Sequence, residues 1–468
     1  MATDADEADP GEGSGPLGAT TDVGGGDPLA GEPWYRRYLW DHRVHAAVVV
    51  LFALYPFAYS GLTEAMPATM TTLLPGITVM VGVLYFGLFA MSFDFVSGYT
   101  GYLDFGHAAF YGIGAYFVIL VANDKVPLLD PSTPFMFSLV IAGLLAALVA
   151  LVIGAVSFRL TGVYFAMITL GFAQVIYVLM SNWDYLGDNP RSGIAVNTSM
   201  HPEGFEVGVP FVDALNMQIA SANFVGETLS TELAGHVIAL SAPEVSYFMI
   251  GLVVGFCYFA MQRVIHSPFG KVMIAIRENE ERAEAIGYDT FKYKMGAFAI
   301  SAFFAAVGGA LFAGYRRSVD PDNSLFFLVA GDALLAAIIG GFGTLAGALF
   351  GFLFFEFLGE LLANNFVSRG GESVPDGLLP YLRDVLGEGT LSTTLFGDVT
   401  VRTVLDVLFN GRAELYIGVL FVLFVLYVPN GILGTLRLWL GGTVAKKLPE
   451  RIGSRLRGGQ ADPGPPDD

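Results

Sequence analysis

The sequence has a single cysteine, Cys257, among 468 residues, and only 14% of its residues are charged. A lone cysteine cannot close a disulfide within the chain, and no Cys/His spacing typical of a metal site occurs. Soluble domains carry about 25% charged residues, so this shortage of charge argues against a soluble protein. Segments of about ten residues with alternating hydrophobicity, typical of outer-membrane barrels, are also missing. These absences leave an integral membrane protein built from helices.

A phosphate-binding loop of the form G-x-x-x-x-G-K-[ST] is missing as well. The one Gly-Lys pair, Gly270-Lys271, is followed by Val272 and has no glycine at the required upstream position. Such a loop cradles the phosphates of ATP with its backbone N–H groups. We therefore expect this chain to bind no ATP, no metal ion and no other cofactor.

Long apolar runs are what the sequence has in abundance, with 54% hydrophobic residues and a mean hydropathy of +0.59. A helix needs about 20 apolar residues to cross the hydrocarbon core of a bilayer. Ten runs approach or reach that length, and they predict an all-α integral membrane protein with about ten transmembrane helices. The runs are Val44–Ser60, Thr71–Met91, Gly106–Ala122, Phe135–Val156, Val163–Met180, Val245–Met261, Met295–Tyr315, Leu325–Ile339, Leu345–Leu362 and Leu415–Gly434.

Basic residues near the ends of the runs predict the orientation, because Lys and Arg are retained on the cytoplasmic side during insertion. They place the connection 263–294 and both chain ends in the cytoplasm of a multi-pass cell-membrane protein. The acidic stretches 181–242 and 363–414 then become external insertions in a transmembrane domain of residues 34–444. Spans two to five and seven to ten would run in opposite senses, as an inverted repeat requires.

The two ends of the chain are polar. Residues 1–33 are acidic and lack apolar periodicity, which predicts a disordered tail, and residues 445–468 are predicted to form a second polar tail. The chain carries 43 acidic and 24 basic residues, a net charge of -19. We interpret this excess of acid as an adaptation to high salt, since net charge keeps proteins soluble; an ordinary acidic surface is the alternative.

The most informative polar stretch runs from His266 to Met295. Its middle, Ile274–Ile286, has apolar and charged residues at helical spacing, and Gly287 supplies a C-terminal stop. We predict one exposed, charged helix here, which would serve as a handle for a soluble subunit. A solvated loop helix without a partner is the alternative.

The stretch GYLDFGHAAFYGIGAYF (Gly101–Phe117) places two polar residues in apolar surroundings. We expect Asp104 to cap the start of the third helix, or to accept a hydrogen bond from His107. An ionisable residue at membrane depth costs about 2.5 to 3.5 kcal/mol on insertion scales, so each one needs an explanation. Hydrogen-bonded structural acids are expected at Asp94, Asp332, Glu356 and Glu360.

Glycines recur at spacings that let helix backbones approach closely in lipid. Helix packing is the expected role of Gly106, Gly112, Gly114, Gly343, Gly347 and Gly351.

Several of these stretches together resemble the LivM-type permeases of branched-chain amino-acid ABC transporters. The resemblance covers roughly residues 71–436, apart from the external insertions, and rests on five motifs in the family's order. They are GYTGYLDFGHAAFYGIGAY (Gly98–Tyr116), TGVYFAMITLGFAQVIY (Thr161–Tyr177), SPFGKVMIAIRENEERAEAIGYD (Ser267–Asp289), GGFGTLAGALFG (Gly340–Gly351) and VPNGILG (Val428–Gly434). The chain departs from the family at Asp104, where the family usually has Ser.

The resemblance implies one permease of an ATP-driven importer that moves branched-chain amino acids by alternating access. Its partners would be a LivH-type second permease, two cytoplasmic ATPase subunits that hold the ATP and magnesium, and an external substrate-binding protein. The residues that would couple the permease to the ATPases are Arg277, Glu281, Arg282, Glu284, Ala285 and Gly287. Candidates for the substrate pathway are His107, Tyr111, Tyr164 and Phe165.

Two other functions remain open from the sequence. A urea or amide permease shares most of the motifs. An ion-coupled secondary transporter would work without ATPases and would use Asp104, His107 and Glu356 as proton or ion sites. The predicted handle counts against the second alternative, because a secondary transporter needs no docking element for a soluble subunit.

Overall fold

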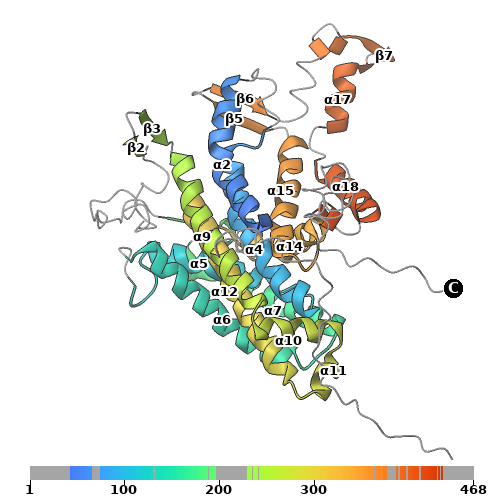
Figure 1. Cartoon of the computed structure of the whole chain (residues 1–468). Helices are drawn as coiled ribbons and strands as arrows, with labels where there is room; N and C mark the ends of the chain where they lie inside the picture. The colour runs from blue at the N-terminus through green and yellow to red at the C-terminus, as the bar shows by residue number, and fades with distance from the viewer. Residues whose placement is uncertain are drawn as a thin grey trace, which may run out of the picture.

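In the computed structural model, the described residues are 43–65, 74–129, 133–187, 189–196, 229–233, 236–240, 242–362, 365–369, 372–376, 386–387, 390–396, 399–409, 413–428, 431–432 and 434–435. The two expected polar tails lie outside them. The described part is mainly helical (Figure 1).

Each of the ten expected spans contains a helix. These helices are α2 (Arg43–Ala65), α4 (Ile77–Thr100), α5 (Ala108–Ala122), α6 (Phe135–Ser157), α7 (Val163–Ser181), α9 (Ala242–Ile265), α12 (Thr290–Arg316), α14 (Phe327–Gly340), α15 (Leu345–Leu362) and α18 (Ala413–Tyr427). Among the described residues, seven helical segments are long and apolar enough to cross a membrane, whereas α2, α5 and α18 contain shorter apolar stretches. The all-α membrane fold is confirmed; the count of ten and the inverted repeat stay predictions.

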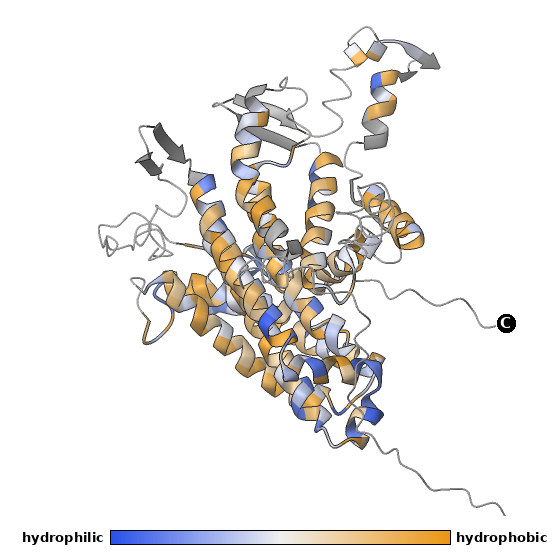
Figure 2. Cartoon of the chain, in the orientation of Figure 1, coloured by the Kyte–Doolittle hydropathy of each residue, from blue (hydrophilic) through white to orange (hydrophobic). Residues whose placement is uncertain are grey.

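Two helices form the centre of the bundle. Over its most apolar 18 residues, α4 is 83% buried and α12 is 72% buried, whereas α6 and α7 are 39% and 22% buried. A helix that is hydrophobic on all sides can be enclosed by other helices, and α4 has this composition. The exposed apolar side chains of α6 and α7 are suited to lipid or to a partner in the membrane (Figure 2).

Small residues bring α12 against α5. A Cβ added at Gly309 would lie 1.9 Å from the carbonyl oxygen of Tyr111, and one added at Gly114 would lie 2.0 Å from that of Ala306. Neither position has room for a side chain. Close contact of this kind replaces the hydrophobic driving force, which is missing between helices in lipid.

The two expected external insertions lie at the same end of the bundle (Figure 1). They contain short antiparallel hairpins, which helical periodicity does not predict. The strands are β2 (Leu229–Leu233) with β3 (His236–Leu240), β5 (Asn365–Arg369) with β6 (Glu372–Asp376), and β7 (Thr394–Phe396) with β8 (Val399–Thr400). The helix α17 (Val401–Phe409) follows β8, and β1 (Ile194–Ala195) pairs with β4 (Ser318–Val319). Two short 3-10 turns, η1 (Asp184–Leu186) and η2 (Pro190–Ser192), lie between α7 and β1 in the chain, and the single helical turn α13 (Pro321–Ser324) lies between β4 and α14.

The opposite end carries two short helices, α10 (Pro268–Glu278) and α11 (Glu280–Ala285). The prediction of one continuous helix over Ile274–Ile286 is wrong. Asn279 adopts an extended backbone (φ -166°, ψ 105°), and its side-chain oxygen accepts a hydrogen bond from Arg282 N, so it ends one helix and caps the next. The predicted stop is confirmed, because Gly287 has a φ of +96°.

Candidate functional site

The α10–α11 segment (Pro268–Ala285) is a small amphipathic unit at the end of the bundle. Val272, Ile276 and Ala283 are buried together, with Tyr293 packed against them. Pro268 occupies the first turn of α10, where its missing N–H costs nothing. The segment therefore folds on the start of α12 with a core of its own, and all of its charged residues except the partly buried Glu280 are exposed (Figure 2).

One attachment joins α10 to the end of α4. Arg277 Nη1 donates a hydrogen bond of 2.6 Å to the carbonyl oxygen of Gly98. A cation is favourable there, because the last carbonyls of a helix carry the negative end of its dipole. The neighbouring turn between α14 and α15 is fixed to the same helix, since Gly343 N donates to Asp94 Oδ1 at 2.7 Å.

A second attachment surrounds Glu280. Tyr102 donates to Glu280 Oε2 at 2.6 Å, and Lys294 forms an ion pair with the same carboxylate. Thr290 shares its one hydroxyl proton between Glu280 Oε1 at 3.1 Å and Glu284 Oε1 at 2.7 Å. Lys294 Nζ also donates to the hydroxyl oxygen of Tyr102 at 3.1 Å. The Lys294 side chain is 5% exposed and that of Glu280 is 27% exposed. The pair is thus largely removed from water. Loss of one partner would be costly, because the other charge would stay buried without its counter-charge.

The contacts of Glu280, above all those with Lys294, lower the pKa of its carboxyl group. Partial burial acts to raise the pKa of Glu280, but hydrogen bonds from Lys294 and Tyr102, the charge of Lys294 and the Thr290 hydroxyl outweigh it. The pKa of Glu280 therefore lies below its usual value. The carboxylate is ionised at neutral pH, as the ion pair requires.

The predicted coupling residues divide between these attachments and the surface. Arg277 is held by Gly98, and Glu284 accepts a hydrogen bond of 2.7 Å from Thr290. The other four are exposed: Glu281, Arg282, Ala285 and Gly287. Beside them, the apolar side chain of Ile286 is 69% exposed. An exposed mixture of charged and apolar groups is suited to contact with another protein.

Asp104 and His107 form a buried polar cluster with two serines. His107 Nδ1 lies 2.9 Å from Asp104 Oδ2, and its Nε2 lies 3.0 Å from Ser92 Oγ and 3.4 Å from Ser301 Oγ. All four side chains are fully buried. The cluster joins α4, the segment before α5, and α12.

The preferred prediction for Asp104, a cap on the third helix, is wrong. Helix α5 begins at Ala108 and its cap residue is His107, with no side-chain capping bond. Asp104 instead accepts a hydrogen bond of 2.9 Å from Gly106 N and holds the His107 ring. The hydrogen bond between Asp104 and His107, the second option from the sequence, is confirmed.

The four predicted pathway residues do not share one site. His107 and Tyr111 are buried and stack near the same ring, Phe89, at centroid distances of 5.4 and 4.7 Å. Phe165 is buried farther along, 5.2 Å from the Tyr102 ring. Tyr164 is 70% exposed on the outer face of α7. A pathway through these residues stays a prediction.

Five of the six predicted packing glycines lie against another backbone or side chain with no room for a Cβ. They are Gly106 against Thr169, Gly112 against Leu325, Gly114 against Ala306, Gly347 against Gly340 and Gly351 against Ala336. Gly343 belongs to the turn between α14 and α15 and not to a helix, and its φ of +83° requires glycine. The turn approaches α4 at Gly98, where an added Cβ would lie 2.8 Å from Gly343 N.

The remaining acids at membrane depth lie in two places. Asp94 is fully buried, and Asp332, Glu356 and Glu360 are half-buried on α14 and α15. In the part of the chain that the structure describes, no group of three or more His, Cys, Asp or Glu side chains is arranged to hold a metal ion.

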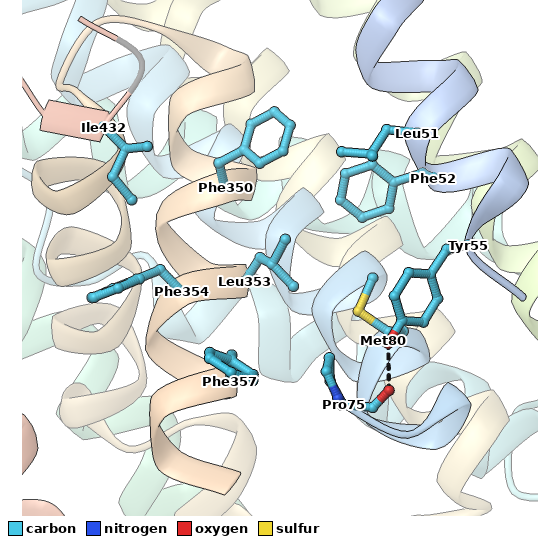
Figure 3. A pocket seen from close by; sticks show the side chains of 10 residues that line it. All are labelled: Leu51, Phe52, Tyr55, Pro75, Met80, Phe350, Leu353, Phe354, Phe357 and Ile432. Atoms are coloured by element: carbon cyan, nitrogen blue, oxygen red, sulfur yellow. Dashed lines mark hydrogen bonds between the residues drawn. The ribbon is translucent and has the colours of Figure 1, made fainter. Parts of the chain in front are cut away.

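A cavity of about 410 Å³ lies between α2, the start of α4, and α15 (Figure 3). Its lining is hydrocarbon: Leu51, Phe52, Tyr55, Pro75, Met80, Phe350, Leu353, Phe354, Phe357 and Ile432. The Tyr55 hydroxyl donates to the Pro75 carbonyl at 2.5 Å. An amino acid would leave its ammonium and carboxylate groups unpaired here, at a cost of several kcal/mol each. The cavity is therefore unsuited to a zwitterionic substrate.

The sequence did not single out Tyr102, Glu280 and Lys294 as site residues. One signal pointed to them: Lys294 stands at the start of an apolar run, so it is drawn toward the membrane and needs an acidic partner. The pattern does not say which of the five acids at Glu278, Glu280, Glu281, Glu284 and Asp289 pairs with it. Tyr102 carried no signal of its own.

Comparison with known proteins places these features in a family. The family model described as "Branched-chain amino acid transport system / permease component" matches residues 77–382. The high-affinity branched-chain amino acid permease LivM of Escherichia coli is 29% identical over 353 residues, which are 73% of this chain and 75% of that protein. A probable LivM of Methanocaldococcus jannaschii is 24% identical over 46% of this chain and 70% of that protein.

A likeness to another group of permeases is also found. The galactose/methyl galactoside import permease MglC of Escherichia coli is 27% identical over 45% of this chain and 56% of that protein. No solved structure gives a significant match.

Proposed function

Because the chain belongs to the family of branched-chain amino acid transport system permease components, we infer that it imports branched-chain amino acids as one membrane-spanning half of an ATP-driven transporter. The observation that carries this proposal is the family match over residues 77–382, which extends from α4 through α15 and includes the α10–α11 segment. The relatives named LivM favour a branched-chain substrate. The weaker likeness to a galactoside permease makes the substrate the first thing to test.

The proposed division of labour places ATP and magnesium on two cytoplasmic ATPase subunits. The sequence supports this, because it lacks a phosphate-binding loop. A LivH-type second permease would complete the membrane path, and an external binding protein would deliver the substrate. This chain would then make and break no covalent bond, and its part would be a change between inward-open and outward-open shapes.

The proposed orientation puts α10 and α11 in the cytoplasm together with both chain ends. Basic residues of this segment support it by the positive-inside rule. The exposed residues Glu281, Arg282 and Ala285 would contact an ATPase. At the other end, the hairpins of the two insertions would face the external binding protein (Figure 1).

Reconstitution tests the proposal. The permease, its second permease and the ATPases are placed in vesicles with ATP on the ATPase side, and the binding protein is added on the other side. We expect ATP-dependent uptake of labelled leucine, isoleucine or valine that survives collapse of the proton gradient by an ionophore. Uptake of urea or galactose in place of these amino acids would contradict the substrate. Uptake driven by a proton gradient without ATPases would contradict the mechanism.

A further inference from the structure

Two bonds from one short segment hold the last turn of α4 and the start of the connection that follows it. Arg277 on α10 binds the carbonyl oxygen of Gly98 at 2.6 Å, and Glu280 on α11 accepts from the Tyr102 hydroxyl at 2.6 Å. Residues 277 and 280 are three positions apart and contact residues four positions apart, 98 and 102. The end of α4 and the start of its connection to α5 are thus both attached to the α10–α11 segment.

The Glu280 attachment is built differently from the rest of the segment's polar surface. Lys294, its ion-pair partner, is 5% exposed and lies 4.8 Å from the centre of the Tyr102 ring and 5.7 Å from that of Phe158. In the part of the chain that the structure describes, Glu280 is the carboxylate within ion-pair distance of Lys294. If Glu280 moved away alone, Lys294 would be left desolvated without its counter-charge.

The Tyr102 ring extends the attachment into the bundle. It packs edge-on against Phe158 at 5.5 Å and Phe165 at 5.2 Å, which belong to the end of α6 and to α7. Two residues after Tyr102, Asp104 binds Gly106 N and His107. A displacement of the Tyr102 hydroxyl is therefore opposed by packing against α6 and α7 and by the bonds of Asp104.

Helix α11 has six residues. A helix this short has no stability of its own in water, so its position is set by its contacts. Its contacts on the bundle side are the buried Ala283 and the bonds of Glu280 and Glu284 to α12 and Tyr102. The residues on its outer side are exposed, so another protein can contact them. These properties suit an element that is moved from outside and that carries its neighbours with it.

We propose that Glu280, Lys294 and Tyr102 form a latch that transmits displacement of α11 to the connection 101–107, which follows α4, and to α12. Glu280 is then a positioning residue of the transport cycle, distinct from the exposed docking residues beside it. The latch rests on the proposed function, because it needs an ATPase to move α11. The exposed docking residues would bind the ATPase, and the latch would transmit the movement of α11 into the bundle.

The test uses the complete reconstituted transporter and compares Glu280→Gln with Glu278→Gln. Glu278 is an exposed acid two residues earlier, at the end of α10. Substrate uptake and ATP hydrolysis are measured on the same vesicles, together with retention of the ATPases on the purified complex. We expect Glu280→Gln to keep its ATPases and to hydrolyse ATP. Its uptake per ATP should fall roughly 2- to 30-fold, the range by which residues along a transmission path change coupling.

Two further variants separate transmission from folding. Tyr102→Phe keeps the ring packing and removes only the hydroxyl, so it should fold normally and lower uptake per ATP in the same direction. The double variant Glu280→Gln/Tyr102→Phe should lose less than the product of the two single losses, because both break one bond. Exchange of the charged pair, Glu280→Lys with Lys294→Glu, should recover part of the coupling that Glu280→Gln loses.

The outcomes distinguish the two proposals. Wild-type vesicles without ATP-dependent uptake would overturn the proposed function, and the latch with it. Wild-type uptake combined with unchanged uptake per ATP in Glu280→Gln and Tyr102→Phe would overturn the latch alone. Equal losses in Glu278→Gln and Glu280→Gln would also overturn it, since an exposed charge would then suffice.

Discussion

Asp104 and His107 form a hydrogen-bonded pair of 2.9 Å in the fully buried part of the bundle. Ser92 Oγ lies 2.7 Å from the carbonyl oxygen of Phe89 and 3.0 Å from His107 Nε2, so the pair continues into a chain of hydrogen bonds that ends on the backbone of α4. Each side chain of this chain has a hydrogen-bond partner, which makes the pair tolerable at membrane depth.

Replacing Asp104 tests the importance of this pair. Asp104→Ser, which introduces the residue usual in the family, removes the acceptor for His107 and for Gly106 N. We expect the free energy of unfolding to fall by about 1 to 3 kcal/mol, the cost of a buried polar group left unpaired. Thermal unfolding of the purified protein in detergent measures the loss. Asp184→Ser, at an exposed position of η1, should leave the midpoint unchanged. An unchanged midpoint for Asp104→Ser would show that water or a neighbouring group replaces the carboxylate.

Much of this architecture follows from local sequence. Each of the ten apolar runs contains a helix, and seven helical segments of the described part have the length and hydropathy that a bilayer requires. The Asp104–His107 bond lies within reach of a three-residue spacing. Tyr102 and Glu280 are 178 positions apart, and no local period relates them. The break at Asn279 depends on one side-chain bond that outweighs the helical spacing on either side.

Alanine substitutions at two helical glycines should change stability in opposite directions, because Gly114 of α5 packs against α12 and Gly171 of α7 has open space around it. In Gly114→Ala the new methyl group would meet the carbonyl of Ala306, so the helices must separate. A cost of about 1 to 3 kcal/mol is typical of overpacking. In Gly171→Ala the methyl group meets nothing within 4 Å. That variant should be stabilised by about 0.5 to 1 kcal/mol, because Ala restricts the unfolded chain. Paired unfolding curves check the prediction, which a lower midpoint for Gly171→Ala would contradict.

The lowered pKa of Glu280 predicts a loss of stability in acid. Burial acts to raise this pKa, but the bonds from Lys294, Tyr102 and Thr290 outweigh it, so the folded protein binds the proton less readily than the unfolded chain. The stabilisation is fully present above the ordinary Glu value and is lost as pH falls through the lowered value. Unfolding midpoints measured downward from pH 7 should decline less steeply for Glu280→Gln than for the wild type. Parallel curves below the ordinary Glu pKa would show that the ion pair contributes no net stability.

The division of the α10–α11 segment into an outer and an inner face predicts two separable defects. Reversal of charge at Glu281→Lys or Arg282→Glu changes only exposed groups, so the permease should remain as stable as the wild type. Binding of the ATPases should weaken, because a reversed charge meets a like charge on the partner, and like charges suppress association at an interface. Retention of ATPase on the immobilised permease, measured at several salt concentrations, reports the defect directly. Asp184→Lys carries the same kind of reversal at the opposite end of the bundle and should retain its ATPases.

Glu280→Gln should show the converse pattern, with ATPase retained and coupling reduced. If Glu281→Lys and Glu280→Gln instead lost ATPase equally, α11 would act as one docking surface, and its buried ion pair would only hold that surface in shape.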